Sequence, residues 1–292
     1  MTPFLIEVAI EPKDPVRRDA LVAALAELAA GDSSLDFALD DESRQVLLKG
    51  VSEEQLDAAV SRLKSEFDLI IGRPQVAYRE RLTTKRVEID YTHKKQTFGS
   101  GQFARVKIVF EPVAIGAGSS FQAMIAAGAV PAEFIPSVEK GVSSAMSSGV
   151  VAGFPVVDVK TTLIDGAYHE TDSSELAFEI AARSAAREAL HDRSELIEPI
   201  MKIDVVTPEE HIGFVIGDLR SRRGQSLNHV RNDDNIIVSA LVPLASMFGY
   251  GSSLRAGTRG RAKFTMSFSH YAPLPPSGGG DDLFPPVVGM RA

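Results

Sequence analysis

The sequence contains no cysteine among its 292 residues, which excludes disulfide bonds, thiolate zinc sites and thiol nucleophiles. Histidine is also scarce, and its six scattered copies form no helix-spaced pair with a carboxylate of the kind that holds a catalytic metal. A membrane-spanning helix requires about 18 consecutive apolar residues, and no apolar run in the sequence approaches that length. The amino terminus also lacks the basic segment followed by an apolar segment that is typical of a secretory signal. These absences remove much of enzyme chemistry and favour a protein of the cytoplasm without a membrane partner.

Positive charge is in deficit, because 31 lysines and arginines face 39 aspartates and glutamates, for a net charge of -8. A protein that binds nucleic acid over most of its surface carries the opposite balance, so any contact with RNA has to come from local basic patches. The chain is 44% hydrophobic, and its length suffices for two or three domains, each with its own core.

The first part of the chain, residues 4–80, has the pattern strand, helix, strand, strand, helix, strand. Its first helix is predicted at 15–30, and a hairpin is predicted to pair 35–39 with 45–48. The second helix places four apolar residues on one face, namely Leu56, Ala59, Val60 and Leu63. This order predicts a ferredoxin-like α/β sandwich domain at residues 1–82.

The last third repeats this order of elements, which predicts a second ferredoxin-like sandwich at residues 197–271. Strands are expected at 200–206, 227–231, 236–241 and 262–269, with helices at 208–222 and 243–254. Thr207, Pro208 and the two glutamates after them are typical of a helix start, where a hydroxyl caps free amides. The remaining residues, 272–292, are rich in glycine and proline and are predicted to form a disordered tail.

The middle, residues 83–196, predicts a different α/β domain. Strands are expected at 86–91, 104–113 and 156–163, and helices at 136–148 and 173–190. The second helix has a clear start, because Asp172 can cap it and Glu175 lies where a capping box places its acid. The fold class is therefore α+β, with two ferredoxin-like domains flanking a βαβ-type domain.

The segment Thr92–Phe103 is a candidate site because it joins two strands within a locally basic stretch of this acidic protein. Lysines on a glycine-containing loop suit phosphate groups, since each neutralised phosphate releases a counterion. The alternative is a solvated hairpin connection with ordinary surface lysines. The candidate RNA-binding residues of this segment are His93, Lys94, Lys95, Gly99, Ser100 and Gly101.

A second candidate segment, Ile164–Ser174, leaves a strand and leads into the capped helix. It offers Tyr168, His169 and Glu170, of which the aromatic ring can stack on a base and the imidazole can hydrogen-bond to sugar or phosphate. A histidine among acids can instead belong to an acid/base or metal site. Turn and capping roles account for the acids, and no nucleophile with an orienting base can be assembled.

Three arginines mark the third candidate segment, and Arg220, Arg222 and Arg223 could clamp phosphates. The alternative is structural, since cations suit the last turn of a helix and Gly224 fits a left-handed cap. The segment Gly116–Ser120 only superficially resembles a phosphate cradle, and the absence of Gly-Lys-Ser/Thr excludes a nucleotide site of the P-loop kind.

Several sequence motifs of the chain resemble those of elongation factor G, from the third to the fifth domain of that family. The segments that carry the resemblance are Val8–Lys13, Gly72–Glu80, Phe134–Gly141, Gly153–Lys160, Asp165–Phe178, Glu198–Lys202, Val215–Gly224 and Met247–Tyr250. One departure is Gly50–Leu56, which replaces the family's usual Gly-Met-Gly-Glu-Leu-His-Leu pattern.

The resemblance implies a ribosome-binding arm that does no chemistry itself and is not an enzyme, because the family's GTPase domain, which binds GTP and Mg²⁺, precedes these domains. It implies that no cofactor is bound here, that the chain is a monomer, and that the middle domain has a left-handed crossover. It also implies that the segments around Lys94 and His169 form a tip that enters the decoding region beside tRNA and mRNA during translocation. The three arginines would contact ribosomal RNA from the last domain.

Other functions stay open at this stage. A paralogue could serve ribosome recycling or tetracycline protection of the ribosome. The chain could also be a stand-alone protein-interaction module, or a hydrolase or metal enzyme built around His169.

Overall fold

The computed structural model describes residues 4–39, 45–97, 100–126, 128–232 and 234–275. These residues form two compact units, one of which is Tyr78–Ile197 and the other of which combines Met1–Ala77 with Glu198–Ala292. Most of the predicted tail, residues 276–292, lies outside the described part of the chain. Each folded part is described by itself below.

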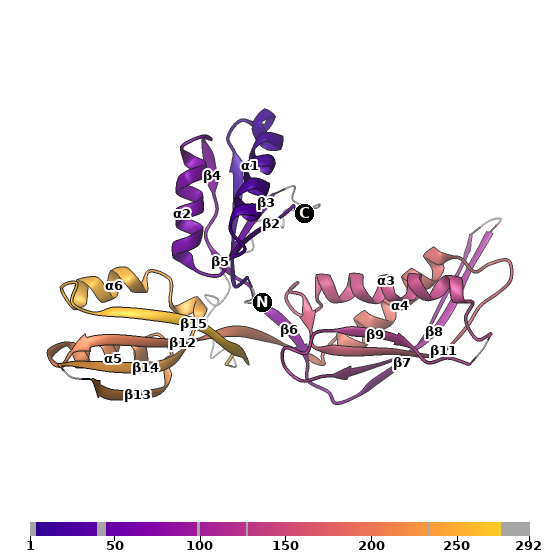
Figure 1. Cartoon of the computed structure of the whole chain (residues 1–292). Coiled ribbons are helices and arrows are strands. Elements are labelled where there is room, and N and C mark those ends of the chain that lie inside the picture. The colour runs from indigo at the N-terminus through magenta and orange to yellow at the C-terminus, as the bar shows by residue number, and fades with distance from the viewer. Residues whose placement is uncertain (1–3, 40–44, 98–99, 127, 233, 276–292) are drawn as a thin grey trace. The chain divides into compact units, whose positions relative to one another are not determined.

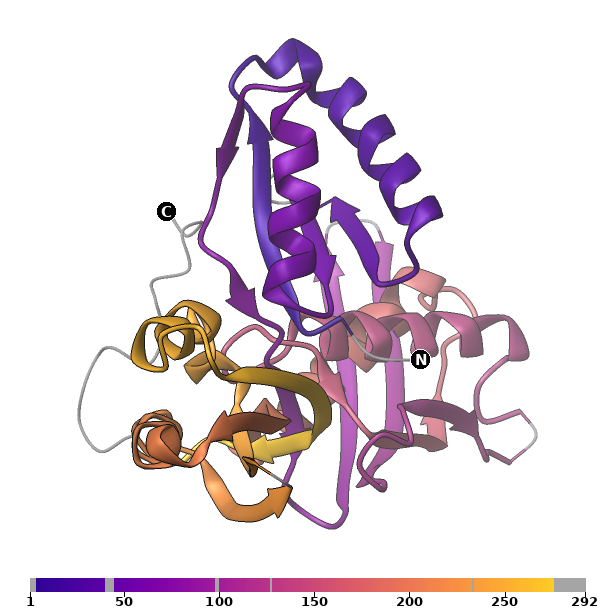
Figure 2. The same ribbon diagram turned by 60° about the vertical axis from the view of Figure 1, so that its left-hand side comes forward.

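The amino-terminal part, up to residue 77, folds as a ferredoxin-like sandwich. Its main elements are β1 (Ile6–Pro12), α1 (Arg18–Gly31), β2 (Leu35–Leu39), β3 (Val46–Gly50), α2 (Glu53–Lys64) and β4 (Leu69–Ile71), followed by the short β5 (Gln75–Val76). The sheet has the order β2-β3-β1-β4, with β5 also pairing with β1. Figure 2 shows both helices running alongside its strands.

The predicted apolar faces form the core of this domain. Alternate residues of β1 are buried, since Ile6, Val8 and Ile10 face inward and the residues between them are half-exposed. All four apolar residues predicted for the face of α2 are buried. The hydroxyl of Ser52 caps this helix by accepting a hydrogen bond from the amide of Gln55, within the segment that departs from the family pattern.

The carboxyl-terminal part repeats the same topology with different residues. Its elements are β12 (Ser194–Pro208), α5 (Ile212–Ser221), β13 (Gln225–Asn232), β14 (Asn235–Pro243), α6 (Tyr250–Gly257) and β15 (Lys263–Pro273). The order β13-β14-β12, with β15 on the other side of β12, matches the order β2-β3-β1-β4. The predicted cap at Thr207 is wrong, because α5 begins at Ile212 and the Thr207 hydroxyl donates to the carbonyl of Pro208.

The unit Tyr78–Ile197 is a sheet covered on one face by two helices (Figure 1). Its elements are β6 (Arg79–Leu82), β7 (Val87–Thr97), β8 (Ser100–Pro112), β9 (Ser120–Ala123), α3 (Ile135–Ser148), β10 (Val156–Val157), β11 (Val159–Ala167) and α4 (Glu175–Leu190). The main sheet has the order β7-β8-β11-β9, and β9 and β11 are parallel neighbours joined through α3. Sequence periodicity missed the short strands β6 and β9.

Small residues let the two helices approach each other closely. Six alanines of α4 are fully buried, and a Cβ added at Gly141 of α3 would lie 2.3 Å from the main-chain oxygen of Glu179. Glycine is therefore required at this crossing. The helices hold the core against the inner faces of β7 and β8, whose outer ends carry the candidate site.

Two buried carboxylates hold loops of this unit. Glu80, with no exposed surface, accepts hydrogen bonds from the main-chain amides of residues 150, 151, 152 and 154. Asp158 accepts hydrogen bonds of 2.9 Å from the amides of Gly116 and Gly118. The segment that superficially resembled a phosphate cradle is thus filled by a carboxylate of the chain itself, and it does not fit a nucleotide phosphate.

Candidate nucleic-acid interface

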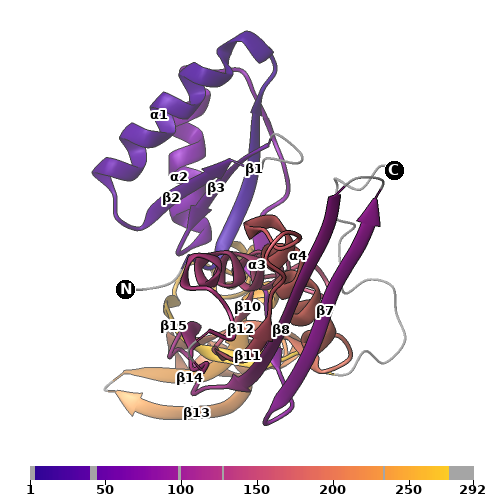
Figure 3. The ribbon, with the colours of Figure 1, turned by 90° about the vertical axis from the view of Figure 1, so that its right-hand side faces the viewer.

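The predicted loop Thr92–Phe103 is instead the outer end of a β-hairpin. Strands β7 and β8 pair without interruption from Val87↔Phe110 to Thr97↔Ser100, and Figure 3 shows them as a long antiparallel pair. The sequence prediction failed because lysine, glutamine and glycine disfavour strands, whereas continuous cross-strand pairing overrides that preference. Gly99 lies outside the described residues.

The hairpin presents its lysines in fixed directions. Lys94 pairs with Phe103 and Lys95 pairs with Gln102, so the two ammonium groups leave opposite faces of the ribbon. Both side chains are exposed, and in the described ranges neither has an ion-pair partner. His93 is half-buried, with its Nε2 atom 3.2 Å from Oε1 of Gln102.

The second candidate segment docks directly on this hairpin. The amide of Phe103 donates a hydrogen bond of 2.8 Å to the carbonyl oxygen of Asp172, and the hydroxyl of Ser173 donates one of 2.7 Å to the carbonyl oxygen of Phe103. A Cβ added at Gly101 would lie 2.6 Å from the carboxyl carbon of Asp172. Two segments predicted separately therefore share one extremity of the unit.

A closed turn presents Tyr168 and His169 to solvent. The hydroxyl of Ser173 accepts a hydrogen bond from the amide of His169, and the amide of Ser173 donates one to the carbonyl of His169. The side chain of His169 is 59% exposed, with its Nδ1 atom 3.4 Å from the carboxylate of Asp172, and Tyr168 is 43% exposed. Glu170 is also exposed at this turn.

Helix α4 begins immediately after this turn, but the predicted cap is wrong. The hydroxyl of Ser174, and not the carboxylate of Asp172, accepts a hydrogen bond from the amide of Ala177. Asp172 is used instead through its main-chain carbonyl on the hairpin. Sequence spacing could not distinguish these roles, because serine and aspartate are equally good caps.

Most of the basic stretch on the open face of the sheet is neutralised by a ladder of ion pairs. Arg105 pairs with both Asp90 and Asp165, and Lys107 pairs with Glu88. Hydrogen bonding to Arg105 lowers the pKa of Asp90, and hydrogen bonding to Lys107 lowers the pKa of Glu88. Lys94 and Lys95 keep their positive charge unpaired among the described residues, at the end of the ribbon.

The three arginines of the third candidate segment differ in their surroundings. Arg220 is exposed, and it has no ion pair in the part of the chain that the structure describes. Arg222 pairs with Asp218, donates to the carbonyl of Ser246 at 2.7 Å and lies over the ring of Tyr250. Arg222 thus braces the end of α5 from inside the domain.

Arg223 has an unusual backbone conformation, with a φ of 66°. Its side chain pairs with the carboxylate of Glu198, which is 2% exposed. The left-handed cap was predicted at Gly224, but Arg223 occupies it. Gly224 is required for another reason, since a Cβ there would lie 2.5 Å from the carbonyl oxygen of Leu219.

Three family models account for nearly all of the chain. Residues 1–72 match elongation factor G domain III, residues 74–193 match elongation factor G domain IV, and residues 195–278 match the elongation factor G C-terminus. The chain belongs to the elongation factor G family. None of the three matched models is a GTPase domain.

One similar protein and one similar solved structure show how much of a longer relative the chain covers. The chain is 56% identical over 274 residues to an elongation factor G of Rhodopseudomonas palustris (strain BisB18), covering 93% of this chain and 40% of that protein. A crystal structure from Thermus thermophilus matches with a TM-score of 0.71 and 36% identity, covering 94% of this chain and 42% of the other. The chain therefore spans less than half the length of the relatives it matches.

Both segments of the extremity lie within elongation factor G domain IV, whereas the arginine segment lies in the C-terminal region. We call the extremity formed by His93–Thr97, Ser100–Phe103 and Tyr168–Ser173 the domain IV tip. Sequence reasoning had not singled out Gln102, Phe103 and Ser173 as supports for the functional residues. Their contacts join residues distant in the sequence, so no local signal could have revealed them.

The described residues give no support to a metal enzyme. In the described ranges no group of three or more histidine, aspartate or glutamate residues could hold a metal ion. The hydroxyl of Thr171 lies 3.1 Å from Nδ1 of His169, and the hydroxyl of Ser173 is occupied by its bonds to two main-chain groups. The described helices also include none long and apolar enough to cross a membrane.

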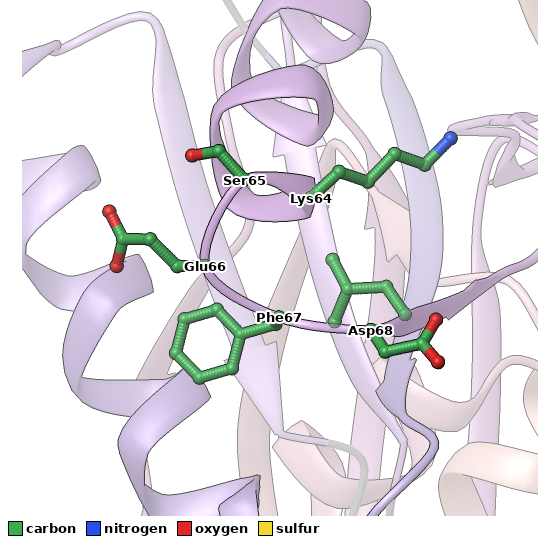
Figure 4. A pocket seen from close by; sticks show the side chains of 6 residues that line it. Lys64, Ser65, Glu66, Phe67 and Asp68 are labelled. Carbon is green, nitrogen blue, oxygen red and sulfur yellow. The ribbon is translucent and has the colours of Figure 1, made fainter.

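A surface depression in domain III shows why a pocket alone does not make a site. It measures about 500 Å³ and is lined by six consecutive residues, Lys64–Leu69, between α2 and β4. In Figure 4 the side chains of Ser65 and Glu66 point away from those of Lys64 and Asp68. Its polar groups do not converge, so the depression offers no arrangement for chemistry.

Proposed function

We propose that this chain is the ribosome-binding portion of a translation factor of the elongation factor G type, and that its domain IV tip promotes movement of tRNA and mRNA through the decoding region. GTP and Mg²⁺ belong to a GTPase domain, which is none of the three domains matched here. In this proposal the chain contributes no catalytic residue. It acts as a monomeric arm on the ribosome in the cytoplasm.

The observation that carries the proposal is that two segments distant in the sequence are hydrogen-bonded together in one tip. The hydrogen bonds from the Phe103 amide to the Asp172 carbonyl and from the Ser173 hydroxyl to the Phe103 carbonyl hold the lysine hairpin against the turn that presents Tyr168 and His169. Ammonium groups attract phosphate, an exposed aromatic ring stacks on a base, and an imidazole hydrogen-bonds to sugar or phosphate. His93, Gly101 and Glu170 shape the same surface.

The ion pairs along the open face of the sheet support a function in which the β7–β8 hairpin is cationic mainly at its tip. Asp90, Asp165 and Glu88 neutralise Arg105 and Lys107 along the open face of the sheet. A ribbon with this distribution is attracted to RNA at its tip while its sides stay close to neutral. Continuous strand pairing keeps the lysines at a fixed place, which suits a part that occupies space beside a moving RNA.

In the C-terminal domain we assign direct contact with ribosomal RNA first to Arg220, whose guanidinium is exposed. Arg222 and Arg223 stabilise the end of α5 through Asp218 and Glu198, and their remaining donor groups add to the same basic surface. The name of the 56% identical relative favours elongation over recycling or tetracycline protection.

Ribosome pelleting tests the proposal directly. The chain should sediment with purified ribosomes at low salt and should dissociate as salt rises. Lys94→Ala combined with Lys95→Ala should weaken sedimentation and lower the salt slope of log K by about one to two. The control is Lys85→Ala combined with Lys140→Ala, which removes equal charge from the same unit but not from the tip. Binding that ignores both salt and the tip lysines would overturn the proposal.

A further inference from the structure

A cavity in domain IV lies away from the residues assigned to RNA. It measures about 240 Å³ and lies between α3 and the β9, β10 and β11 side of the sheet. One wall is a face of α3, where Glu139, Ser143 and Ser147 recur every four residues, and Met146 lies beside them. Phe121 of β9 and Thr161 of β11 contribute from the sheet.

One lining residue of this cavity, Thr161, carries a buried hydroxyl without a hydrogen-bond partner among the described residues. Thr161 is 1% exposed, yet its Oγ1 atom has no hydrogen-bond partner among the described residues. An unpaired buried hydroxyl destabilises the fold, so polar groups of this kind are nearly always satisfied in native proteins. The neighbouring Thr162 shows the usual situation, because its hydroxyl accepts a hydrogen bond of 3.0 Å from Gln122.

The lining determines which charge a ligand can carry. It contains the hydroxyls of four serines and Thr161 together with the carboxylate of Glu139, and its described residues include no lysine, arginine or histidine. An anion would meet one negative charge and no positive charge, so phosphates and carboxylates are disfavoured. Glu139 is exposed and forms no ion pair with any described residue, and it can therefore receive a cation.

The exposed and buried lining residues differ in polarity, and this difference determines the order of chemical groups along a matching ligand. Glu139, Ser143 and Ser147 are exposed, whereas Met146 and Thr161 are buried. A ligand that matches this order has an ammonium group at the solvent side, an apolar body against Met146 and Phe121, and a hydroxyl at its far end. We propose that the cavity binds a small primary amine whose apolar body ends in a hydroxyl group.

Tyramine is a suitable probe because it carries an ammonium group, an aromatic body and a terminal hydroxyl. Two relatives change one end each: phenethylamine lacks the hydroxyl, and 3-(4-hydroxyphenyl)propanoate replaces the ammonium with a carboxylate. Binding to the 292-residue chain is followed by the ¹³C-methyl NMR signal of Met146, which is assigned by its loss in Met146→Leu. Tyramine should shift this signal saturably with a Kd on the order of 1 mM, and the propanoate should not.

Substitutions test which residue contacts each end of the ligand. Thr161→Val should weaken tyramine about fivefold and leave phenethylamine unchanged, because only tyramine has a hydroxyl to lose the bond. Glu139→Gln should weaken both amines about equally. The matched controls are Thr162→Val and Glu133→Gln, which alter the same chemical groups outside the cavity and should leave both affinities unchanged.

Thermal unfolding checks the unpaired hydroxyl without any ligand. Thr161→Val should raise the melting temperature, since it removes a buried polar group that has no partner among the described residues, whereas Thr162→Val should lower it. The proposal is overturned if tyramine produces no saturable shift of Met146, if Thr161→Val weakens both amines alike, or if Thr161→Val lowers the melting temperature. Each of these results leaves the ribosomal role of the tip untouched.

Discussion

The amide of Phe103 and the carbonyl of Asp172 form a hydrogen bond of 2.8 Å that joins the hairpin of domain IV to the turn before α4. This bond helps to place the lysine pair and His169 at one extremity. The hydroxyl of Ser173 reinforces the joint on the carbonyl side of Phe103, although the two residues are 70 positions apart in the sequence.

Ser173→Ala should loosen this joint. The hydroxyl both donates to the carbonyl of Phe103 and accepts from the amide of His169, so its removal leaves one acceptor and one donor to be solvated. We expect the His169 amide to exchange its hydrogen about tenfold faster, as measured by NMR. Ser148→Ala, which removes a hydroxyl within α3, is the control, and unchanged exchange at His169 would contradict the assigned role.

The start of α4 provides a second prediction. Ser174→Ala should accelerate hydrogen exchange at the Ala177 amide about fivefold, because the cap contributes about 1 kcal/mol. Asp172→Ala should leave that amide nearly unaffected, since its carboxylate does not cap the helix. The reverse pattern would restore Asp172 as the cap.

Glu80→Gln should be among the most destabilising single changes in domain IV. A carboxylate accepts hydrogen bonds from four main-chain amides there, and an amide side chain would turn one donor group toward other donors. The expected loss is about 2–4 kcal/mol of unfolding free energy, measured by urea unfolding followed through NMR signals of residues in the unit. Glu133→Gln on the surface is the control, and equal stability of the two variants would refute the role of Glu80.

The ion-pair ladder predicts sensitivity to acid. The folded pKa of Glu88 and that of Asp90 lie below their ordinary values of 4.5 and 3.8, because Lys107 and Arg105 hydrogen-bond to the ionised carboxylates. A lowered folded pKa contributes stability that is present above the ordinary value and is lost as pH falls through the folded pKa. The contribution is small, because these groups are near the surface.

This loss can be measured by titrating the open face of the sheet by NMR from about pH 6 downward to about pH 2. The hairpin signals of the wild type should change below about pH 4, and Glu88→Gln combined with Asp90→Asn should remove most of that change. A transition centred near about pH 6 in the wild type would point to histidine and would contradict this account.

In a full-length factor, His169→Ala should slow translocation and leave ribosome-stimulated GTP hydrolysis largely intact. The side chain lies on an exposed turn of domain IV, whereas the proposed function assigns the nucleotide to a separate GTPase domain. Rapid kinetics of tRNA movement and phosphate release separate the two steps. His191→Ala, another exposed histidine of the same unit, is the control. A loss of hydrolysis would contradict this division of roles.

The sequence by itself determined most of the helices and strands and the apolar faces that form their cores. Apolar spacing predicted the buried face of α2, and the order of elements predicted two ferredoxin-like domains, as the burial of α2 and the strand orders confirm. These features depend on side-chain period within one element, which is a local property of the chain. The locally basic stretch and the exposed turn could be predicted because they too are local features of the sequence.

Only the tertiary structure decided how these segments are used. Strand pairing continues through the segment that was expected to be a loop, and the helix cap is Ser174 and not the predicted Asp172. Arg223 takes the left-handed backbone conformation and forms an ion pair with Glu198. Glycine is required at position 224 because a Cβ there would lie too close to the main chain of Leu219. The role of each of these residues depends on which group, distant in the sequence, lies beside it in the fold. A local sequence pattern does not identify that group.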